Sequence, residues 1–291
     1  MDDWNYITSL DTRECPIYHR LSEQPGRGGF EMRLKDKVVL IAGAGRNMSR
    51  ATALLFAQEG AKVALAARTT VEMNETAGRI EAAGGEVLTC QVDLTDEAQV
   101  DGLVAGVVER FGGVDCLIHA SGGFYGGDEI DKMEPSFWDE AIQNNLYTLF
   151  YPTRKVVPVM ESRGGGCIIT LTAGFRVRQD ANSAYAAAKA GMIAMVLNLA
   201  KELYDKNIRA HTICPGIMWD PIPDGPIRPV EPKLERLGNP IDAAYAALWL
   251  CSDEAAWITG LEVTVDGGDS MFIDSPVRRG ALRERFGERG C

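Results

Sequence analysis

Between residues 37 and 123 the chain alternates short apolar runs with longer segments of helical character. The short runs carry apolar side chains at almost every position, which is typical of strands buried on both faces. Strands of this kind form parallel sheets that helices cover. The segments are, in order, KVVLIAGAG (37–45), SRATALLFAQEG (49–60), AKVALAAR (61–68), VEMNETAGRIEAAGG (71–85), EVLTCQVDL (86–94), TDEAQVDGLVAGVVERFGG (95–113) and VDCLIHASGG (114–123).

The same alternation continues to the end of the chain. One sheet accounts for the whole pattern, so we expect an α/β fold with a doubly wound parallel sheet of about seven strands. Thr95, followed by Asp and Glu, is expected to open the helix over 95–113. The later segments are a long helix over 135–160, a strand over 165–174, a helix over 183–205, a strand over 207–216, a helix over 240–252 and a strand over 260–268. The predicted divisions are an N-terminal extension (1–33), one folded domain (34–273) and a C-terminal tail (274–291).

Composition excludes several classes of partner. The net charge of −11 disfavours nucleic acid, because an acidic surface repels phosphate backbones. The seven cysteines are widely spaced and form no CxxC, and the three histidines have no ligand spacing, so we expect no metal site. Widely spaced thiols also fit a reduced, cytoplasmic protein. Neither a signal peptide nor an apolar run of about 20 residues is visible, so no membrane is expected.

The turn AGAGRNMSR, residues 42–50, lies where a dinucleotide phosphate would bind. In the frame GxGxxG, Gly43 and Gly45 fit but Met48 takes the third place. In the frame GxxxGxG, Asn47 and Ser49 replace two glycines. Asn tolerates positive φ, and Ser is small and carries a hydroxyl that could bond a phosphate. This stretch alone also fits an ordinary strand-to-helix turn.

The end of the second strand carries information on cofactor choice. It ends in Ala67 and Arg68, where an acidic residue would favour the ribose hydroxyl of NAD. Arg46 adds a second cation, and two guanidinium groups suit the 2′-phosphate of NADP. We therefore expect NADP(H) in preference to NAD(H). The alternative is that Arg68 is a solvated loop charge.

The segment AYAAAKAG places Tyr185 and Lys189 four residues apart, on one helix face. A nearby ammonium favours the phenolate, which suits proton transfer to or from an alcohol oxygen. Tyr151 and Lys155 share the same spacing, but the residue thirteen positions before Tyr151 is Trp138. The residue thirteen positions before Tyr185 is Thr172, which offers a hydroxyl. We therefore interpret Tyr151 and Lys155 as ordinary helix residues.

These motifs together resemble the single-domain branch of the short-chain dehydrogenase/reductase superfamily, over about residues 34–272. The resemblance implies a Rossmann-type fold with helices on both faces of the sheet, and self-association, commonly as a homotetramer. The motifs that carry it are the glycine turn, Asp93-Leu94, Asn145, the set Thr172, Tyr185 and Lys189, Pro215-Gly216, RLGNP (236–240) and WITGLEVTVDGG (257–268).

The resemblance also implies roles for individual residues. Tyr185 would be the general acid in reduction, and Lys189 would hold the nicotinamide ribose and lower the pKa of the tyrosine. Thr172 would polarise the substrate carbonyl, and Asn145 would support a water that leads protons away from Lys189. The expected cofactor-binding residues are Gly43, Gly45, Arg46, Asn47, Met48, Arg68, Asp93, Leu94, Ala120, Ser121, Gly122, Tyr185, Lys189, Pro215 and Gly216.

Several positions depart from the family pattern. Thr172 stands where Ser is usual, and Ala120 stands where the family has Asn in NNAG. Asp220 replaces a frequent Thr after the proline. Together with Asn47 and Ser49, these departures bear on cofactor affinity more than on the reaction, because none of them removes a group that takes part in the chemistry.

Substrate contacts are expected from the loops 122–129, 174–182 and 217–232, which follow strands. Phe124, Phe175 and Trp219 could line an apolar pocket. Arg176 and Arg178 could hold a carboxylate or could be solvated. We expect an NADPH-dependent reductase that converts a small-molecule ketone to an alcohol. The alternatives are reduction of a C=C or C=N bond, NAD-linked alcohol oxidation, or a non-catalytic nucleotide-binding protein.

Overall fold

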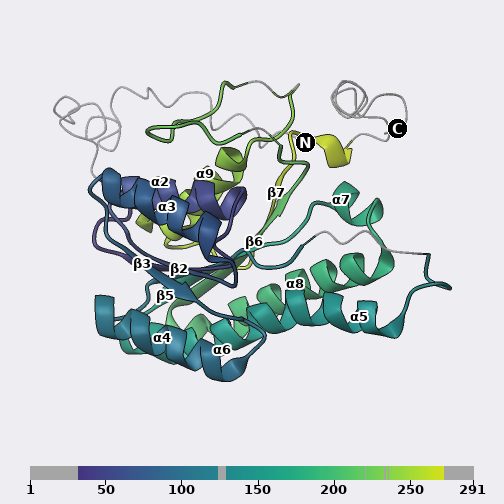
Figure 1. Cartoon of the computed structure of the whole chain (residues 1–291), viewed down its shortest axis with the longest axis horizontal. Coiled ribbons are helices and arrows are strands. Elements are labelled where there is room, and N and C mark those ends of the chain that lie inside the picture. Colours follow the sequence, from purple (N-terminus) through teal and green to yellow (C-terminus); the bar gives the residue numbers. More distant parts are fainter. Residues whose placement is uncertain (1–31, 124–128, 220, 233, 235, 272–291) are drawn as a thin grey trace, which may run out of the picture. The chain divides into compact units, whose positions relative to one another are not determined.

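The computed structural model describes residues 32–123, 129–219, 221–232, 234 and 236–271. Its centre is a seven-stranded sheet whose neighbouring strands all pair in parallel, in the order β3-β2-β1-β4-β5-β6-β7 (Figure 1). This confirms the predicted fold class. The strands are β1 (Val38–Ala42), β2 (Lys62–Ala67), β3 (Val87–Gln91), β4 (Cys116–His119), β5 (Gly166–Leu171), β6 (Ile208–Pro215) and β7 (Glu262–Val265).

Helices cover both faces of the sheet. Figure 1 shows α2, α3 and α9 on one face and α4, α6 and α8 on the other. The longer helices are α2 (Met48–Gln58), α3 (Thr70–Ala82), α4 (Glu97–Phe111), α5 (Pro135–Ile142), α6 (Thr148–Ser162), α8 (Ser183–Glu202) and α9 (Pro240–Cys251). Short helices are η2 (Gln143–Tyr147), α7 (Phe175–Gln179), η3 (Tyr204–Lys206), η4 (Asp253–Ala255) and η5 (Asp269–Met271).

The apolar character of β1 follows from its two covered faces. Val39 and Ile41 belong to the core cluster shared with α2 and α9, whereas Val38, Leu40 and Ala42 belong to the cluster shared with α4, α6 and α8. A strand whose side chains alternate between two cores must be apolar at every position. The outer strands β3 and β7 are less buried than the continuous apolar pattern predicts, because each has a strand neighbour on one side only.

Three local predictions differ from the structure. The helix over 135–160 contains a π-helical segment, Gln143–Tyr147, and extends to Ser162. The helix over 95–113 is capped by Asp96, not by Thr95, since the Asp96 carboxylate accepts from the backbone amides of Ala98 and Gln99. The loop 174–182 contains the short helix α7, Phe175–Gln179.

The order of the strands positions the site. β1 and β4 are neighbours at the centre, and the chain proceeds from them to opposite sides of the sheet. Loops that leave such a point in opposite directions open a crevice at the carboxyl ends of the strands. The turn after β1 and the loop after β4 form the two walls of this crevice.

Gly43 allows these two walls to approach each other. Its φ is +96°, and a Cβ at this position would lie 2.4 Å from the backbone nitrogen of Ser121. Backbone cannot move aside as a flexible side chain can, so position 43 requires glycine. Gly45 differs: a Cβ there would meet no atom within 4 Å.

We predict that Gly43→Ala destabilises the fold and that Gly45→Ala does not. Gly43→Ala should lower the free energy of unfolding by about 2–4 kcal/mol, because it adds both a clash and a strained φ. Gly45→Ala should change it by less than about 1 kcal/mol. Chemical denaturation of both variants measures this, and equal destabilisation of the two would contradict the assignment of the contact.

Candidate active site

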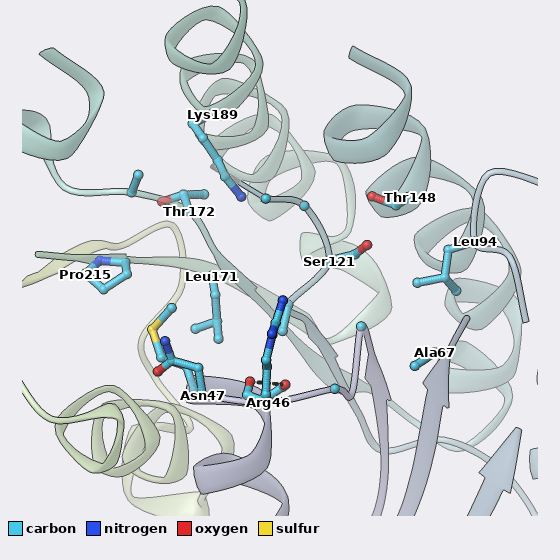
Figure 2. Close-up of a pocket in the computed structure, with 18 of the residues that line it drawn as sticks. Arg46, Asn47, Ala67, Leu94, Ser121, Thr148, Leu171, Thr172, Lys189 and Pro215 are labelled. Atoms are coloured by element: carbon cyan, nitrogen blue, oxygen red, sulfur yellow. Dashed lines mark hydrogen bonds between the residues drawn. The ribbon is translucent and has the colours of Figure 1, made fainter. Parts of the chain in front are cut away.

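A cavity of about 590 Å³ opens at the carboxyl ends of the strands (Figure 2). Its volume lies in the range of small-molecule and cofactor sites. Every cofactor-binding residue predicted from the sequence lines it, from Gly43 in the first turn to Gly216 after β6. The sequence analysis did not name Thr69, Glu72, Val92, Thr148, Leu171, Val177 and Met218, which also line it.

The amino terminus of α2 faces this cavity. Asn47 precedes the helix with φ 57° and ψ −128°, a conformation that Asn tolerates and most residues do not. The Asn47 side chain makes no capping hydrogen bond, and the first turn of the helix carries no acidic residue. Its amide groups and the positive end of its dipole therefore suit an anion such as a phosphate.

Ser49 has a different role from the one expected. Its hydroxyl donates to the backbone carbonyl of Arg46 at 2.9 Å, and the side chain is buried. The hydroxyl closes the turn instead of offering its proton to a phosphate. The small size of Ser49 still meets the need for close packing between helix and sheet.

The far end of the cavity is polar. Arg46 and Arg68 are exposed and line it, and Figure 2 shows Arg46 extending upward from the turn before α2. The Asp93 carboxylate accepts hydrogen bonds from the amide and the hydroxyl of Thr95. These bonds lower the pKa of the carboxyl, and the bond from the amide has the larger effect. Glu72, in the first turn of α3, also lines the cavity, and its Oε2 atom is buried with no hydrogen-bond partner among the described residues.

Tyr185 and Lys189 reach the opposite end from α8. The Asn182 side chain accepts from the Tyr185 amide at 2.9 Å, which fixes where the helix begins. The Lys189 ammonium lies 5.7 Å from the centre of the Tyr185 ring. Both side chains are buried, and burial lowers the pKa of Lys189 to about 8. An Asn before an alanine-rich helix is a sequence signal that identifies this cap.

Thr172 follows β5 and lines the same end of the cavity. Its hydroxyl is 3.2 Å from the Ile213 carbonyl and 2.9 Å from the Cys214 sulfur. The Cys214 thiol in turn donates to Glu262 Oε1 at 3.4 Å. The Ile213 carbonyl also accepts from the Thr172 amide at 2.8 Å, so it keeps a partner when the hydroxyl turns toward a substrate.

Asn145 lies behind the cavity wall, in the π-helical segment. Its amide nitrogen donates to the Ala141 carbonyl at 2.8 Å, while its buried Oδ1 has no hydrogen-bond partner among the described residues. A Cβ on Gly122 would lie 2.2 Å from this oxygen and 3.1 Å from the Lys189 nitrogen. Gly122 therefore brings the backbone close to both polar atoms, and π-helical segments are frequent at such sites.

His119 supports this end of the cavity from below. It is fully buried, and its Nε2 lies 3.1 Å from the Thr148 hydroxyl. That hydroxyl donates to the carbonyls of Asn144 and Asn145, so the histidine is the donor in the His119–Thr148 bond. Burial, and then the charge of Lys189, lower the pKa of His119 to about 3. The imidazole is therefore neutral under ordinary conditions.

The predicted substrate residues are not gathered at the cavity. Phe175 and Trp219 are 52% and 41% exposed and do not line it, and Phe124 lies outside the described residues. Arg178 donates to the Ala173 carbonyl at 2.5 Å and lies 3.9 Å from Glu262, so it holds the local chain. Apolar lining comes instead from Leu171, Val177 and Met218.

The second Tyr–Lys pair is structural, as the sequence indicates. Lys155 forms ion pairs with Glu97 and Asp101 of α4, at 3.0 and 2.6 Å. The Tyr151 ring contacts the rings of Tyr147 and Phe150. Neither Tyr151 nor Lys155 lines the cavity.

The buried neutral His119 predicts a dependence of stability on pH. The unfolded chain takes up a proton at this residue below about pH 6.5, whereas the folded chain does not until about pH 3, so stability falls as the pH decreases through this window. Between pH 7 and 5 this residue should account for a loss of about 2 kcal/mol. Denaturant titrations of the wild type and of His119→Asn at both pH values measure it. Equal losses in the two proteins would contradict the prediction.

Comparison with known proteins agrees with this geometry. A family model described as Enoyl-(Acyl carrier protein) reductase matches residues 43–270. The 7alpha-hydroxysteroid dehydrogenase of Escherichia coli (strain K12) is 34% identical over 245 residues, which are 81% of this chain and 95% of that protein.

Solved structures show the same architecture. A short-chain dehydrogenase/reductase from Burkholderia xenovorans, described as putative, superposes with a TM-score of 0.74 and 36% identity, and the match covers 83% of this chain and 99% of that one. A 7alpha-hydroxysteroid dehydrogenase complexed with NADH and 7-oxo glycochenodeoxycholic acid has a TM-score of 0.72 and 30% identity, covering 82% and 96% of the two chains. The protein therefore belongs to the short-chain dehydrogenase/reductase superfamily of nicotinamide-dependent oxidoreductases.

Proposed function

We propose that this oxidoreductase uses NADPH to reduce a small-molecule ketone to an alcohol, with Tyr185 as the general acid. The observation that carries the proposal is the arrangement of one cavity. Tyr185, Lys189 and Thr172 line one end of it, and the amino terminus of α2 with Arg46 and Arg68 lines the other. A dinucleotide needs both an anion site and a redox site along one groove.

The lining residues fit such a cofactor. The uncapped α2 terminus would bind the pyrophosphate, Asp93 and Leu94 would border the adenine, and Pro215 and Gly216 would border the nicotinamide. The open space above Gly45, where a Cβ would meet no protein atom within 4 Å, leaves room for a phosphate beside the backbone. When bound, the nicotinamide supplies a hydride to the carbonyl carbon, or accepts one in the reverse direction.

Tyr185 would donate its phenolic proton to the substrate oxygen in reduction and remove that proton in oxidation. The neighbouring Lys189 ammonium stabilises the phenolate that forms. Because the pKa of Lys189 is about 8, its side chain carries a positive charge in most protein molecules at neutral pH. The Asn145 oxygen beside Lys189, which no described residue hydrogen-bonds, would accept a hydrogen bond during the transfer of protons.

Thr172 would donate its hydroxyl hydrogen bond to the substrate carbonyl oxygen, where negative charge develops. To do so the hydroxyl gives up the Ile213 carbonyl as its acceptor, and the Thr172 amide keeps that carbonyl satisfied. The Cys214 thiol, 2.9 Å away, would then turn its proton from Glu262 to the hydroxyl oxygen, which keeps that oxygen hydrogen-bonded.

We predict that substitutions at the catalytic end lower turnover without loss of cofactor. Tyr185→Phe should reduce kcat by at least about 100-fold, because proton transfer loses its donor. Thr172→Val should reduce it by about 10- to 1000-fold, whereas Thr172→Ser should stay close to the wild type. A panel of ketones, aldehydes and enoyl thioesters, followed by NADPH consumption and product analysis, measures this. Unchanged turnover in Tyr185→Phe, or turnover with the enoyl compounds alone, would contradict the proposal.

One observation favours NAD(H) as a second candidate. Glu72 lines the cavity with a buried carboxylate oxygen that has no hydrogen-bond partner in the described part of the chain. This oxygen repels a phosphate and could accept from a ribose hydroxyl. The related 7alpha-hydroxysteroid dehydrogenase was solved with NADH. Arg46 and Arg68 weigh against it, because they bring two positive charges to the same cavity.

The balance between these charges gives a second prediction. Arg46→Ala and Arg68→Ala should each raise the Kd for NADPH by about 10-fold or more, corresponding to about 1.4 kcal/mol, and leave the Kd for NADH nearly unchanged. Glu72→Gln, which removes one negative charge at similar volume, should tighten NADPH. Fluorescence titration of each variant with both cofactors measures this. If Glu72→Gln instead weakens NADH and the arginine variants affect neither cofactor, the protein is NAD-dependent.

A further inference from the structure

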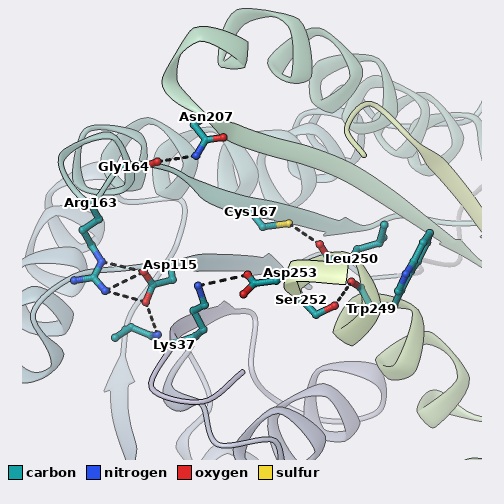
Figure 3. A network of polar contacts seen from close by, with 11 residues as sticks. Lys37, Asp115, Arg163, Gly164, Cys167, Asn207, Trp249, Leu250, Ser252 and Asp253 are labelled. Carbon is teal, nitrogen blue, oxygen red and sulfur yellow. Dashed lines mark hydrogen bonds and ion pairs between the residues drawn. The ribbon is translucent and has the colours of Figure 1, made fainter. Parts of the chain in front are cut away.

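A second cavity, of about 220 Å³, lies at the opposite edge of the sheet, beside the first residues of β1, β4, β5 and β6. Figure 3 shows this region, with Arg163 paired to Asp115 and Lys37 paired to Asp253 at its rim. Three free thiols line the cavity, from Cys116, Cys167 and Cys251. The active site at the other edge uses none of them.

The sheet brings these thiols together. Cys116 of β4 pairs in register with Cys167 of β5, and Cys167 pairs in register with Arg209 of β6. The two thiols and the arginine therefore form one row on one face of the sheet. Cys251 is the last residue of α9, which covers that face. The carbonyl of the preceding residue, Leu250, lies 3.5 Å from the Cys167 sulfur, so the end of α9 lies directly against β5.

The two thiols at the centre of this group differ in chemistry. The hydrogen bond from Cys251, and then the positive charge of Arg209, lower the pKa of Cys167 although burial opposes them. Burial and the neighbouring thiols raise the pKa of Cys251 well above its ordinary value. The thiolate is the nucleophile in thiol oxidation, and of the three thiols only Cys167 lies in register beside Arg209, whose positive charge favours a thiolate. We therefore assign the first attack to Cys167.

Geometry selects Cys251 as the second sulfur. Cys116 and Cys167 lie in interior strands, and hydrogen-bond ladders on both sides hold their backbones. Cys251 is the last residue of a helix, where the backbone is less constrained than in an interior strand. The chain continues from it in an extended conformation at Ser252. The Cys167 thiol already donates to the carbonyl of Leu250, the residue before Cys251, at 3.5 Å (Figure 3).

We propose that Cys167 and Cys251 form a peroxide-reactive dithiol site, which closes to a reversible disulfide. The Cys167 thiolate attacks hydrogen peroxide, so an S–O bond forms, the O–O bond breaks, and the released hydroxide takes up a proton to give water. Cys251 sulfur then attacks the Cys167 sulfenic acid, so the S–S bond forms and water leaves with the Cys251 proton. Two thiols lose two electrons in total, and one peroxide is reduced to two waters.

The cavity makes the site selective for small oxidants. Cys167 and Cys251 are 2% and 5% exposed, so a bulky disulfide reagent cannot contact their sulfurs without displacing the wall. Hydrogen peroxide is close to water in size and fits a polar cavity of this volume. Cys90, a half-buried thiol on the outer strand β3, does not line this cavity and serves as an internal comparison.

The test is peptide mapping of the full chain after brief treatment with hydrogen peroxide. We expect a Cys167–Cys251 cross-linked peptide that dithiothreitol removes, with the loss of two free thiols per chain. Cys251→Ser should abolish the cross-link and leave a Cys167 sulfenic acid that dimedone labels. The matched variants Cys90→Ser and Cys116→Ser should keep the cross-link.

Each other result overturns the proposal. It fails if the cross-link joins Cys116 to either partner, if oxidation is confined to other cysteines, or if dimedone does not label Cys167 in Cys251→Ser. Circular dichroism of each variant establishes that it is folded, and the mapping of the wild type does not depend on any variant. A bulky aromatic disulfide reagent should give less than about a tenth of the cross-link obtained with peroxide, since it cannot enter.

Discussion

The structure depends on the close contact between the turn after β1 and the loop after β4. The two central strands pair directly, and the missing side chain of Gly43 lets the Ser121 backbone approach. From this contact the chain departs to opposite faces of the sheet, which opens the large cavity at the carboxyl edge. The uncapped α2 terminus and the loop with Gly122 both take their positions from it. A glycine usually associated with phosphate binding thus acts first as a packing residue.

Burial of basic groups is the second organising feature. Lys189 lines the cavity and the fully buried His119 lies behind its wall, and burial lowers the pKa of both. The neutral histidine leaves Lys189 as the positive charge beside Tyr185, and its hydrogen bond to Thr148 links it to the π-helical segment that carries Asn145. Two fully charged bases at this depth would repel each other and would each lose their hydration. One charge and one neutral donor avoid that cost.

Much of the fold and the cavity lining could be predicted from the sequence, because both follow from local patterns. Apolar runs identify the central strands, and the resemblance to the family, through motifs near the ends of strands, identifies Asp93, Ala120 and Pro215. The π-helical segment could not be predicted, since an extra residue in a helical turn leaves no mark on the apolar pattern. The directions of individual side chains could not be predicted from the sequence either. Ser49 turns to the Arg46 carbonyl, Phe175 to solvent, and Glu72 to the cavity. The thiol site depends on strand register, which a single sequence does not specify.

The central claim is that the cavity at the carboxyl edge binds a nicotinamide dinucleotide with Tyr185 and Lys189 at its reactive end. The most direct measurement is a titration of the wild-type protein with NADPH and with NADH, followed by nicotinamide fluorescence. The account predicts saturable binding of one cofactor per chain, with NADPH bound at least about 10-fold more tightly. Absence of binding by either cofactor would mean that Asn47 and Ser49 do not form a working phosphate site, and would contradict the account.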